Sequence, residues 1–262
     1  AESALACALR TSANARSGYA HAPMIRLQKL AKRFGSFEAV RGIDLEIPSG
    51  QLVGLLGPNG AGKSTTLKML TGTLVPTSGT AEIDGFDVAK DPLAVKKILG
   101  YVPETGAVFE ALTGREYLEL VAALHGIPEN EVDARIERFL SFFDLSAADA
   151  RSAPLSTFSK GMRQKIVITA ALLHNPRVVF FDEPLNGLDA NAALLFKTLV
   201  TNLAKEGKTV VWCSHILDVV ERICERVVIV HQGRVLEDGT VPAILERHKA
   251  AYDAQIGKLE PQ

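Results

Sequence analysis

Eight consecutive residues, Gly57 to Ser64, have the types and spacing of a loop that holds phosphate. Their sequence, GPNGAGKS, fits the pattern G-x-x-x-x-G-K-[ST], whose glycines let backbone N–H groups approach phosphate oxygens without obstruction. Lys63 is placed for the β- and γ-phosphates and the Ser64 hydroxyl for Mg²⁺. A plain glycine turn is the alternative, disfavoured because a strand pattern precedes the loop and a helical pattern follows it. The expected phosphate contacts are Gly57, Pro58, Asn59, Gly60, Ala61, Gly62, Lys63, Ser64 and Thr65.

Two neighbouring carboxylates supply the second candidate group. Asp182 and Glu183 end the apolar run 178–181, and ligands bind at the carboxyl ends of strands in α/β sheets. Asp182 is placed to hold Mg²⁺, directly or through water, and Glu183 to orient and polarise an attacking water. The alternative is two acids that end a strand in solvent, and the nearby phosphate loop disfavours it.

The elements that must position these groups are of three kinds. Residues 25–48 alternate apolar and polar side chains, which predicts an antiparallel sheet with turns at Gly35 and Gly42. The runs 51–56, 178–181 and 209–213 are apolar without alternation, which predicts parallel strands covered by helices on both faces. The expected fold is therefore α/β: a core of parallel strands and helices with an antiparallel β subdomain and an inserted helical subdomain at about 104–175.

The inserted segment has three helical patterns. Thr113 and Glu116 form a capping box, and Gly126 and Pro128 end the helix that follows. A third helix starts near Ser159 and ends at 175–176. Between them, a second helix places five apolar residues at helical spacing, and these are expected in the core: Val132, Ile136, Phe139, Leu140 and Phe143.

Composition narrows the class of protein. A net charge of −1 over 262 residues disfavours a nucleic-acid-coating protein, and three scattered cysteines disfavour a disulfide framework or a zinc site and fit a reducing compartment. No apolar run approaches the roughly 20 residues that cross a bilayer, so the chain is expected to be soluble alone. Residues 1–23 are rich in alanine and serine, and a disordered extension, or extra sequence upstream of a start at Met24, is favoured over a transit peptide. Residues 24–262 are expected to form one domain.

The stretch 155–164, LSTFSKGMRQ, resembles the signature motif of ABC (ATP-binding cassette) ATPases, whose usual core is Leu-Ser-Gly-Gly-Gln. Ser159 and Gly161 match that core, whereas Phe158, Lys160 and Met162 depart from it. Ordinary helix capping by Ser159 is the alternative. The order of the motifs favours the signature: phosphate loop, helical insert, Ser-x-Gly helix start, then the Asp-Glu strand.

The resemblance implies further site residues. Phe34 would stack on adenine with Val40 nearby, ordinary sheet packing being the alternative for Phe34. Asp189 would lie at a dimer interface, and His215, which follows a strand, would contact the γ-phosphate. Glu104 stands where the family usually has glutamine, and it would reach Mg²⁺ or the attacking water.

The implied function is an ATP-hydrolysing subunit that uses Mg²⁺ and works as a dimer, a homodimer being favoured although heterodimers stay open. Ser159, Lys160, Gly161 and Met162 of one copy would close over ATP held by the other. The dimer would drive a separate membrane permease, in the export direction, from the cytoplasmic face. Two rivals remain: a non-transport ABC protein, and a binding module without catalysis.

Overall fold

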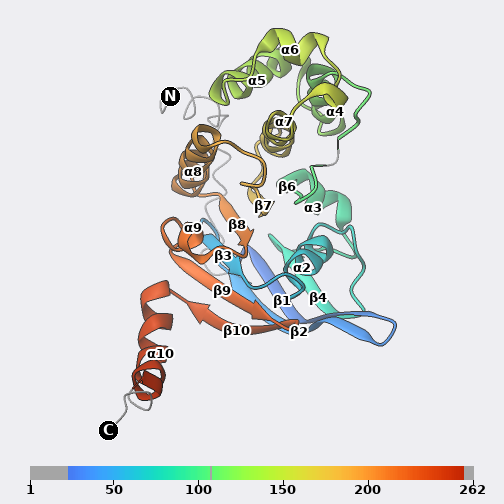
Figure 1. Ribbon diagram of the computed structural model, residues 1–262. Helices are drawn as coiled ribbons and strands as arrows, with labels where there is room; N and C mark the ends of the chain where they lie inside the picture. The colour runs from blue at the N-terminus through green and yellow to red at the C-terminus, as the bar shows by residue number, and fades with distance from the viewer. Residues whose placement is uncertain (1–22, 107, 257–262) are drawn as a thin grey trace.

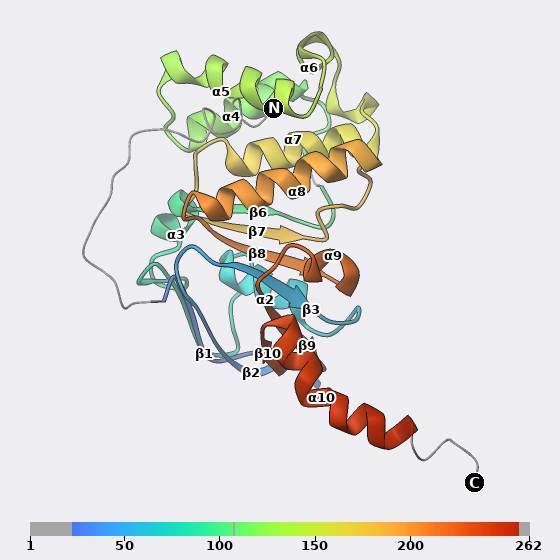
Figure 2. The same ribbon diagram turned by 90° about the vertical axis from the view of Figure 1, so that its left-hand side faces the viewer.

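The computed structural model describes residues 23–106 and 108–256, so the expected N-terminal extension lies outside the described residues apart from Pro23. The described chain forms two β-sheets, with a group of helices set apart from them at the top of Figure 1. The turned view separates the layers. Helices α7 (Lys160–Leu172) and α8 (Ala190–Lys205) cover one face of the larger sheet, and the smaller sheet and α2 (Lys63–Leu70) lie on the other (Figure 2).

The smaller sheet has the order β2-β1-β4-β5 and is antiparallel throughout. The expected turn at Gly35 is confirmed, since it joins the first two strands. The expected turn at Gly42 is wrong: this glycine lies inside β2 with a φ of 74°, where the register shifts between the Leu30–Ile43 and Ala31–Arg41 pairs. Gly42 is the extra residue of a β-bulge, which demands the same positive φ as a turn. The strands are β1 (Ile25–Phe34), β2 (Phe37–Ile47), β4 (Ser78–Ile83) and β5 (Phe86–Asp87).

The larger sheet has the order β10-β9-β3-β8-β7-β6, parallel except for the edge strand β10. Every residue of β3, β7 and β8 is buried, which confirms the expectation drawn from their unbroken apolar runs. The carboxyl ends of these three central strands therefore lie side by side. The strands are β3 (Leu52–Leu56), β6 (Leu99–Val102), β7 (Val178–Asp182), β8 (Thr209–Ser214), β9 (Arg226–His231) and β10 (Arg234–Gly239).

The helices set apart from the sheets follow β6 in the chain. The capping box at Thr113 is confirmed: its hydroxyl accepts from the Glu116 N–H, and the Glu116 carboxylate accepts from the Thr113 N–H. Of the five apolar residues expected in the core, four are buried and Val132 is half-buried. The elements are α4 (Gly114–Leu124), α5 (Glu129–Phe142), α6 (Ala147–Ser152), a 3₁₀ turn (Leu155–Thr157) and α7, which ends at Leu172, short of the expected 175–176.

Four further helices complete the described fold, and sequence analysis did not predict them as separate elements. Helix α8 packs on β8 and α9 on β3 and β8, while α10 leaves the body of the molecule (Figure 1). Their bounds are α3 (Pro92–Ile98), α8 as above, α9 (Leu217–Glu221) and α10 (Val241–Ile256).

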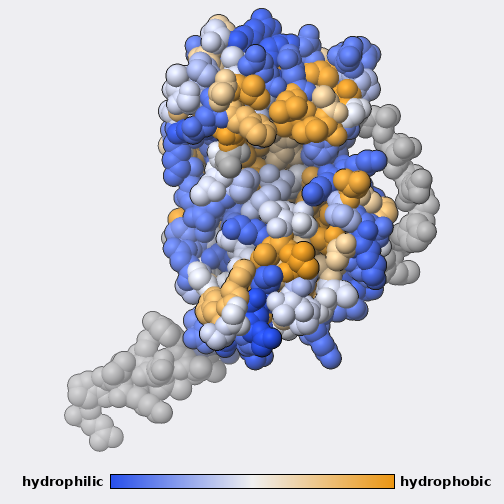
Figure 3. Space-filling model, turned by 90° about the vertical axis from the view of Figure 1, so that its right-hand side faces the viewer, coloured by the Kyte–Doolittle hydropathy of each residue, from blue (hydrophilic) through white to orange (hydrophobic). Residues whose placement is uncertain are grey.

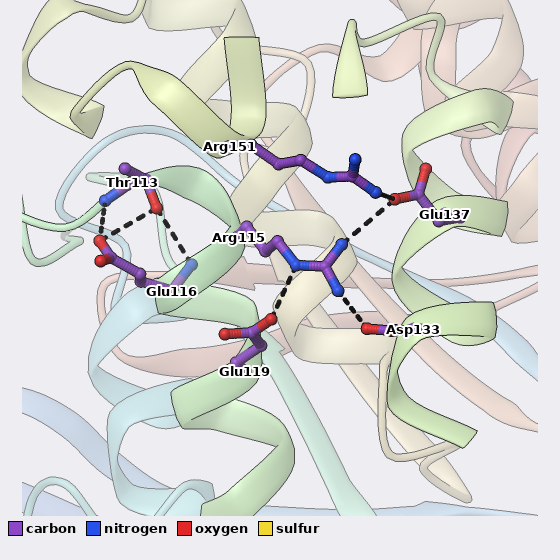
Figure 4. A network of polar contacts seen from close by, with 7 residues as sticks. All are labelled: Thr113, Arg115, Glu116, Glu119, Asp133, Glu137 and Arg151. Carbon is purple, nitrogen blue, oxygen red and sulfur yellow. Dashed lines mark hydrogen bonds and ion pairs between the residues drawn. The ribbon is translucent and has the colours of Figure 1, made fainter. Parts of the chain in front are cut away.

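One arginine joins the helices of the insert. The Arg115 guanidinium on α4 bonds Glu119 at 2.7 Å, and it also reaches Glu137 at 3.2 Å and Asp133, both on α5 (Figure 4). Glu137 in turn accepts from Arg151 of α6 at 2.7 Å. The Arg115 side chain is 19% exposed, so this network is less screened by solvent than an isolated surface pair. It ties α4, α5 and α6 to one another.

Replacing Arg115 by methionine is expected to lower the free energy of unfolding by about 1 kcal/mol. The loss is small because each ion pair with an exposed carboxylate contributes only about 0.2–1 kcal/mol to stability. Chemical denaturation at low and high salt measures this loss, which should shrink as salt screens the wild-type network. Arg26→Met, which breaks the single pair with Glu46 on the antiparallel sheet, is the matched control. An Arg115→Met loss that does not change with salt would contradict the electrostatic account.

Two histidines stack where the insert meets the larger sheet. The rings of His125, after α4, and His174, after α7, lie 3.7 Å apart and nearly parallel. The Nε2 atom of His174 lies 3.1 Å from the Leu99 carbonyl, so Nε2 carries the proton and Nδ1 is left buried without a hydrogen-bond partner. Burial, followed by the neighbouring His125, lowers the pKa of His174 to about 4.

The fold is expected to lose stability in acid through His174. Its pKa rises towards the ordinary value near 6.5 on unfolding, so below that pH the unfolded chain binds a proton that the folded chain excludes. The free energy of unfolding should therefore fall by about 2 kcal/mol between pH 7 and pH 5 from this group. His174→Gln removes the titration, and the wild-type and variant stability profiles should converge as pH falls. Parallel profiles would contradict the prediction.

Candidate active site

The phosphate loop runs from the end of β3 into α2. Gly62 precedes the helix with a φ of 108°, and a β-carbon there would lie 2.7 Å from the Ala39 carbonyl oxygen. Only glycine fits this position, because both the backbone conformation and the space exclude a side chain. No side chain caps α2, so the N–H groups of its first turn stay free for an anion.

Lys63 is buried, with 6% of its surface exposed. Its Nζ donates to the carbonyl oxygens of Gly57 at 2.6 Å and Pro58 at 3.1 Å. These bonds hold the ammonium group beneath the loop whose N–H groups face the pocket. The structure thus places the cation where an anion on the loop would meet it.

Asp182 and Ser64 meet, although 118 positions separate them in the chain. The Ser64 hydroxyl donates to Oδ1 of Asp182 at 3.2 Å. Burial raises the pKa of Asp182, the bond from Ser64 opposes that rise, and the charges of Glu104 and Glu183 add to it. A carboxylate under these conditions favours a nearby cation.

Glu183 lies beside His215 because β7 and β8 are neighbours. Oε1 of Glu183 is 2.8 Å from Nδ1 of His215, and the Ser214 hydroxyl donates to Oε2 at 3.4 Å. A carboxylate only accepts, so Nδ1 of His215 carries the proton. Glu183 has a φ of 48°, an uncommon conformation for a residue with a side chain, and its N–H donates to the Cys213 carbonyl at 3.1 Å. Glu183 is buried, with 8% of its surface exposed, and it lines the pocket at the phosphate loop.

A pocket of about 260 Å³ lies at the phosphate loop. Glu104 and Glu183 line it together with residues 59–65 of the loop, whereas Gly57, Pro58, Asp182 and His215 are not among its lining residues. Its lining is Phe37, Ala39, Asn59, Gly60, Ala61, Gly62, Lys63, Ser64, Thr65, Glu104 and Glu183.

The residues expected to contact adenine occupy different environments. Phe34 pairs with Phe37 across the end of the β1–β2 hairpin, and the Lys32 ammonium lies 5.2 Å from the Phe34 ring centroid. Phe37, not Phe34, lines the pocket, and Val40 is buried beneath the loop while Ala39 lines the pocket. The roles of Phe34 and Val40 stay predictions. Phe37 is an additional aromatic candidate that sequence reasoning missed, and its position two residues after Gly35 was the available signal.

The signature residues lie outside that pocket. Ser159 caps α7, its hydroxyl accepting from the Met162 N–H at 3.1 Å, and both Ser159 and Lys160 are exposed. Asp189 caps α8 through the Ala192 N–H at 2.8 Å. A β-carbon on Gly161 would lie 2.7 Å from the Gly187 carbonyl oxygen, so the two helix starts are in close contact.

Comparison with known proteins decides the family. The family model described as "ABC transporter" matches residues 40–186, the span from the second strand through the phosphate loop and the signature to Asn186. The chain belongs to the ABC transporter family.

ABC relatives match most of the chain. The ABC transporter ATP-binding protein NatA of Bacillus subtilis (strain 168) is 37% identical over 87% of this chain and 94% of its own length. The daunorubicin/doxorubicin resistance ATP-binding protein DrrA of Streptomyces peucetius is 36% identical over 82% of this chain and 65% of its own. Rat ATP-binding cassette sub-family A member 7 is 38% identical over 82% of this chain, which spans only 10% of that protein.

Solved ABC structures have the same fold. An ATP-binding subunit of an ABC transporter superposes with a TM-score of 0.81 at 32% identity, over 86% of this chain and 93% of that one. A dimeric ATP-binding cassette in a post-hydrolysis state, bound to ADP and Pi, has a TM-score of 0.76 at 27% identity, over 83% and 99%. This ABC chain is an ATP-binding and ATP-hydrolysing subunit. Within its described residues, no helix is long and apolar enough to span a membrane.

Proposed function

We propose that this ABC subunit hydrolyses Mg²⁺-bound ATP in the pocket above the phosphate loop and drives a separate membrane permease. One observation carries the catalytic part: Lys63 and Glu183 line one pocket at the carboxyl ends of neighbouring strands, with Asp182 bonded to Ser64 and His215 to Glu183. Strand order alone brings these side chains together from three separate stretches of the chain.

The residues present fit a magnesium ion. Ser64 and Asp182 are already within hydrogen-bonding distance, and Mg²⁺ prefers one or two such protein oxygens with phosphate and water as its other ligands. The described residues contain no group of three or more His, Cys, Asp or Glu side chains that could hold a metal alone, which agrees with this division of ligands. Glu104 also lines the pocket, and we propose its carboxylate as a third oxygen ligand of the magnesium ion. When bound, the ion neutralises charge on the β- and γ-phosphates.

In this proposal, side chains and backbone groups of the chain itself bind the phosphates and activate the attacking water. The loop N–H groups and Lys63 bind the phosphates, and Glu183 orients a water for in-line attack on the γ-phosphorus and accepts its proton. The bond between that phosphorus and the β,γ-bridging oxygen breaks, giving ADP and phosphate. Nδ1 of His215 lies 2.8 Å from the Glu183 carboxylate, which supports a role of His215 in holding that carboxylate in place and in contacting the γ-phosphate.

A second copy of the chain completes the site. Ser159 and Lys160 are exposed and do not line their own pocket, which supports a role over the ATP of the partner copy together with Gly161 and Met162. Ser159 caps the Met162 N–H, so the N–H groups of Lys160 and Gly161 together with the positive dipole at the start of α7 suit a phosphate. Asp189, at the start of α8, would lie at the same interface. We propose a homodimer with two such sites, because every half-site is intact in this one chain.

The surface for a permease would surround α3 and the segment before α4. Leu93 is 74% exposed and Phe109 63% exposed, with the Phe109 ring 6.3 Å from that of Tyr117. Hydrophobic residues gather on the corresponding face, over the upper helical part and again lower down (Figure 3). Exposed apolar groups of this kind mark interaction sites. Relatives named for drug resistance, DrrA and the linearmycin resistance protein LnrL, support export from the cytoplasmic face.

Purification of the tagged chain from detergent-solubilised membranes of its own host tests the permease. A polytopic membrane protein should copurify and, reconstituted with the chain in vesicles, should change its ATPase rate. Leu93→Asp with Phe109→Asp should abolish that effect while leaving the rate of the isolated chain unchanged. Leu236→Asp, an equally exposed apolar position on β10, is the matched control. Full ATPase activity with no membrane protein bound or responding would contradict the proposal.

A further inference from the structure

Gln164 is a buried polar residue that the chemistry above does not use. It lies in the second turn of α7, five residues after the cap Ser159, and only 4% of its surface is exposed. A buried amide costs free energy unless its donors and acceptors are paired. The groups that contact the Gln164 amide therefore indicate its structural role.

The donor side of the amide reaches the catalytic segment. Nε2 of Gln164 donates to the Pro184 carbonyl oxygen at 3.2 Å, and only the nitrogen end of the side chain suits that acceptor. Pro184 is the residue directly after Glu183. The Glu183 backbone is held from the strand side by the Cys213 carbonyl, and it accepts from the Asn186 N–H at 3.1 Å. The Gln164 bond holds the same short segment from the side of α7.

The acceptor atom of the amide, Oε1, lies close to the segment 104–106, which begins at Glu104. A β-carbon built on Gly106 would be 3.3 Å from Oε1 of Gln164, so the backbone passes close to the amide two residues after Glu104. One buried side chain thus lies between two segments that carry carboxylates of the pocket. It is attached to the helix whose first turn carries the signature residues.

We propose that Gln164 is a positioning residue, which sets the Glu183 carboxylate relative to the start of α7 and to the Glu104 segment. The proposal rests on the catalytic role of Glu183 in the proposed function. Gln164 does not itself line the pocket, so its substitution is expected to act on turnover and not on nucleotide binding.

Gln164→Met tests this role, because methionine keeps the length of the side chain and removes both polar ends. Steady-state ATPase measurements on the full chain should show kcat at least about tenfold lower with KM within about twofold, the signature of a contact that matters only in the transition state. Gln164→Glu, which keeps the acceptor and loses the donor, should behave alike. Thr169→Val is the matched control: it removes another buried polar bond of α7, to the Lys165 carbonyl, and should leave kcat unchanged.

A double-mutant cycle separates positioning from folding. If Gln164 acts through Glu183, Gln164→Met should lower kcat less in a Glu183→Asp background, which keeps a carboxylate and measurable turnover, than in the wild type, and the ATP-bound dimer should still form. An unchanged kcat in Gln164→Met overturns the proposal. Additive losses of kcat in the double variant, accompanied by lower nucleotide affinity and a lower melting temperature in Gln164→Met, overturn it as well. Normal turnover in Glu183→Gln alone would instead overturn the proposed role of Glu183, and the kcat–KM split of the single Gln164 variants would still decide whether Gln164 affects turnover.

Discussion

Replacing Glu183 by glutamine should abolish ATP turnover, leave ATP binding intact and trap the chain as an ATP-bound dimer. The glutamine amide has the shape of the carboxylate but no basic oxygen for the proton of the attacking water. Loss of a positioned general base costs about 10²–10⁴-fold in rate. The phosphate loop, Lys63 and Ser64 are unchanged, so the affinity for ATP should be unchanged as well.

The dimer should accumulate because its dissociation requires hydrolysis. Size-exclusion chromatography with light scattering should show a dimer with ATP and a monomer with ADP, alongside a phosphate-release assay near background. Glu225→Gln, a substitution of the same kind at an exposed position after α9, is the control and should retain wild-type turnover and dissociate after hydrolysis. Undiminished hydrolysis in Glu183→Gln would exclude Glu183 as the base.

The Glu183 variant should also free His215. In the wild type, Nδ1 of His215 lies 2.8 Å from Oε1 of a charged carboxylate, and an amide at that position gives a weaker hydrogen bond. His215→Ala in the otherwise wild-type chain should therefore also lower turnover without loss of ATP affinity, since both residues act on the same step. Unchanged turnover in His215→Ala would place His215 in a separate role.

Replacing Lys63 by alanine is the second large effect, and it should remove nucleotide binding. The ammonium group is buried and already bonded to two loop carbonyls, so its removal takes away the fixed positive charge and the two bonds that shape the loop. Charged hydrogen bonds contribute about 1.5–3 kcal/mol each, and one or two lost bonds to phosphate correspond to roughly 10²-fold or more in affinity.

Titration with a fluorescent ATP analogue measures this loss, and thermal unfolding with and without Mg²⁺-ATP gives an independent reading. Wild-type chain should be stabilised by saturating nucleotide, whereas Lys63→Ala should not be. Lys68→Ala, an exposed lysine one turn further along α2, is the control and should bind normally. Unchanged affinity in Lys63→Ala would contradict the assignment of residues 57–64 as the phosphate loop.

Local sequence patterns predict a feature when all the residues that define it are close together in the chain. The glycines and Lys63 of the phosphate loop, the Asp182–Glu183 pair after an apolar strand and the capping box at Thr113 each depend on spacing within a single segment. Buried strands without alternation predicted the parallel sheet for the same reason, since a strand covered on both faces has no polar side.

Features that depend on which segments meet were beyond the sequence. Gly42 needs a positive φ in a turn or in a bulge, and only pairing with β1 shows that it is a bulge. The Arg115 network and the burial of Gln164 likewise depend on helix packing. Phe34 and Phe37 are both plausible aromatics near the loop, and the hairpin geometry decides which one lines the pocket.

Sequence patterns predict the chemistry of the site: a phosphate loop, two carboxylates, a histidine after a strand and the Ser-x-Gly start of a helix, all recognisable because each is local. Their arrangement in space depends on the tertiary structure. The order β3-β8-β7 places Lys63, His215 and Glu183 at adjacent strand ends, and the packing of α7 against residues 183–187 connects the helix that starts after Ser159 to the Glu183 segment. Such contacts join residues far apart in the chain, and no spacing rule along one segment encodes them.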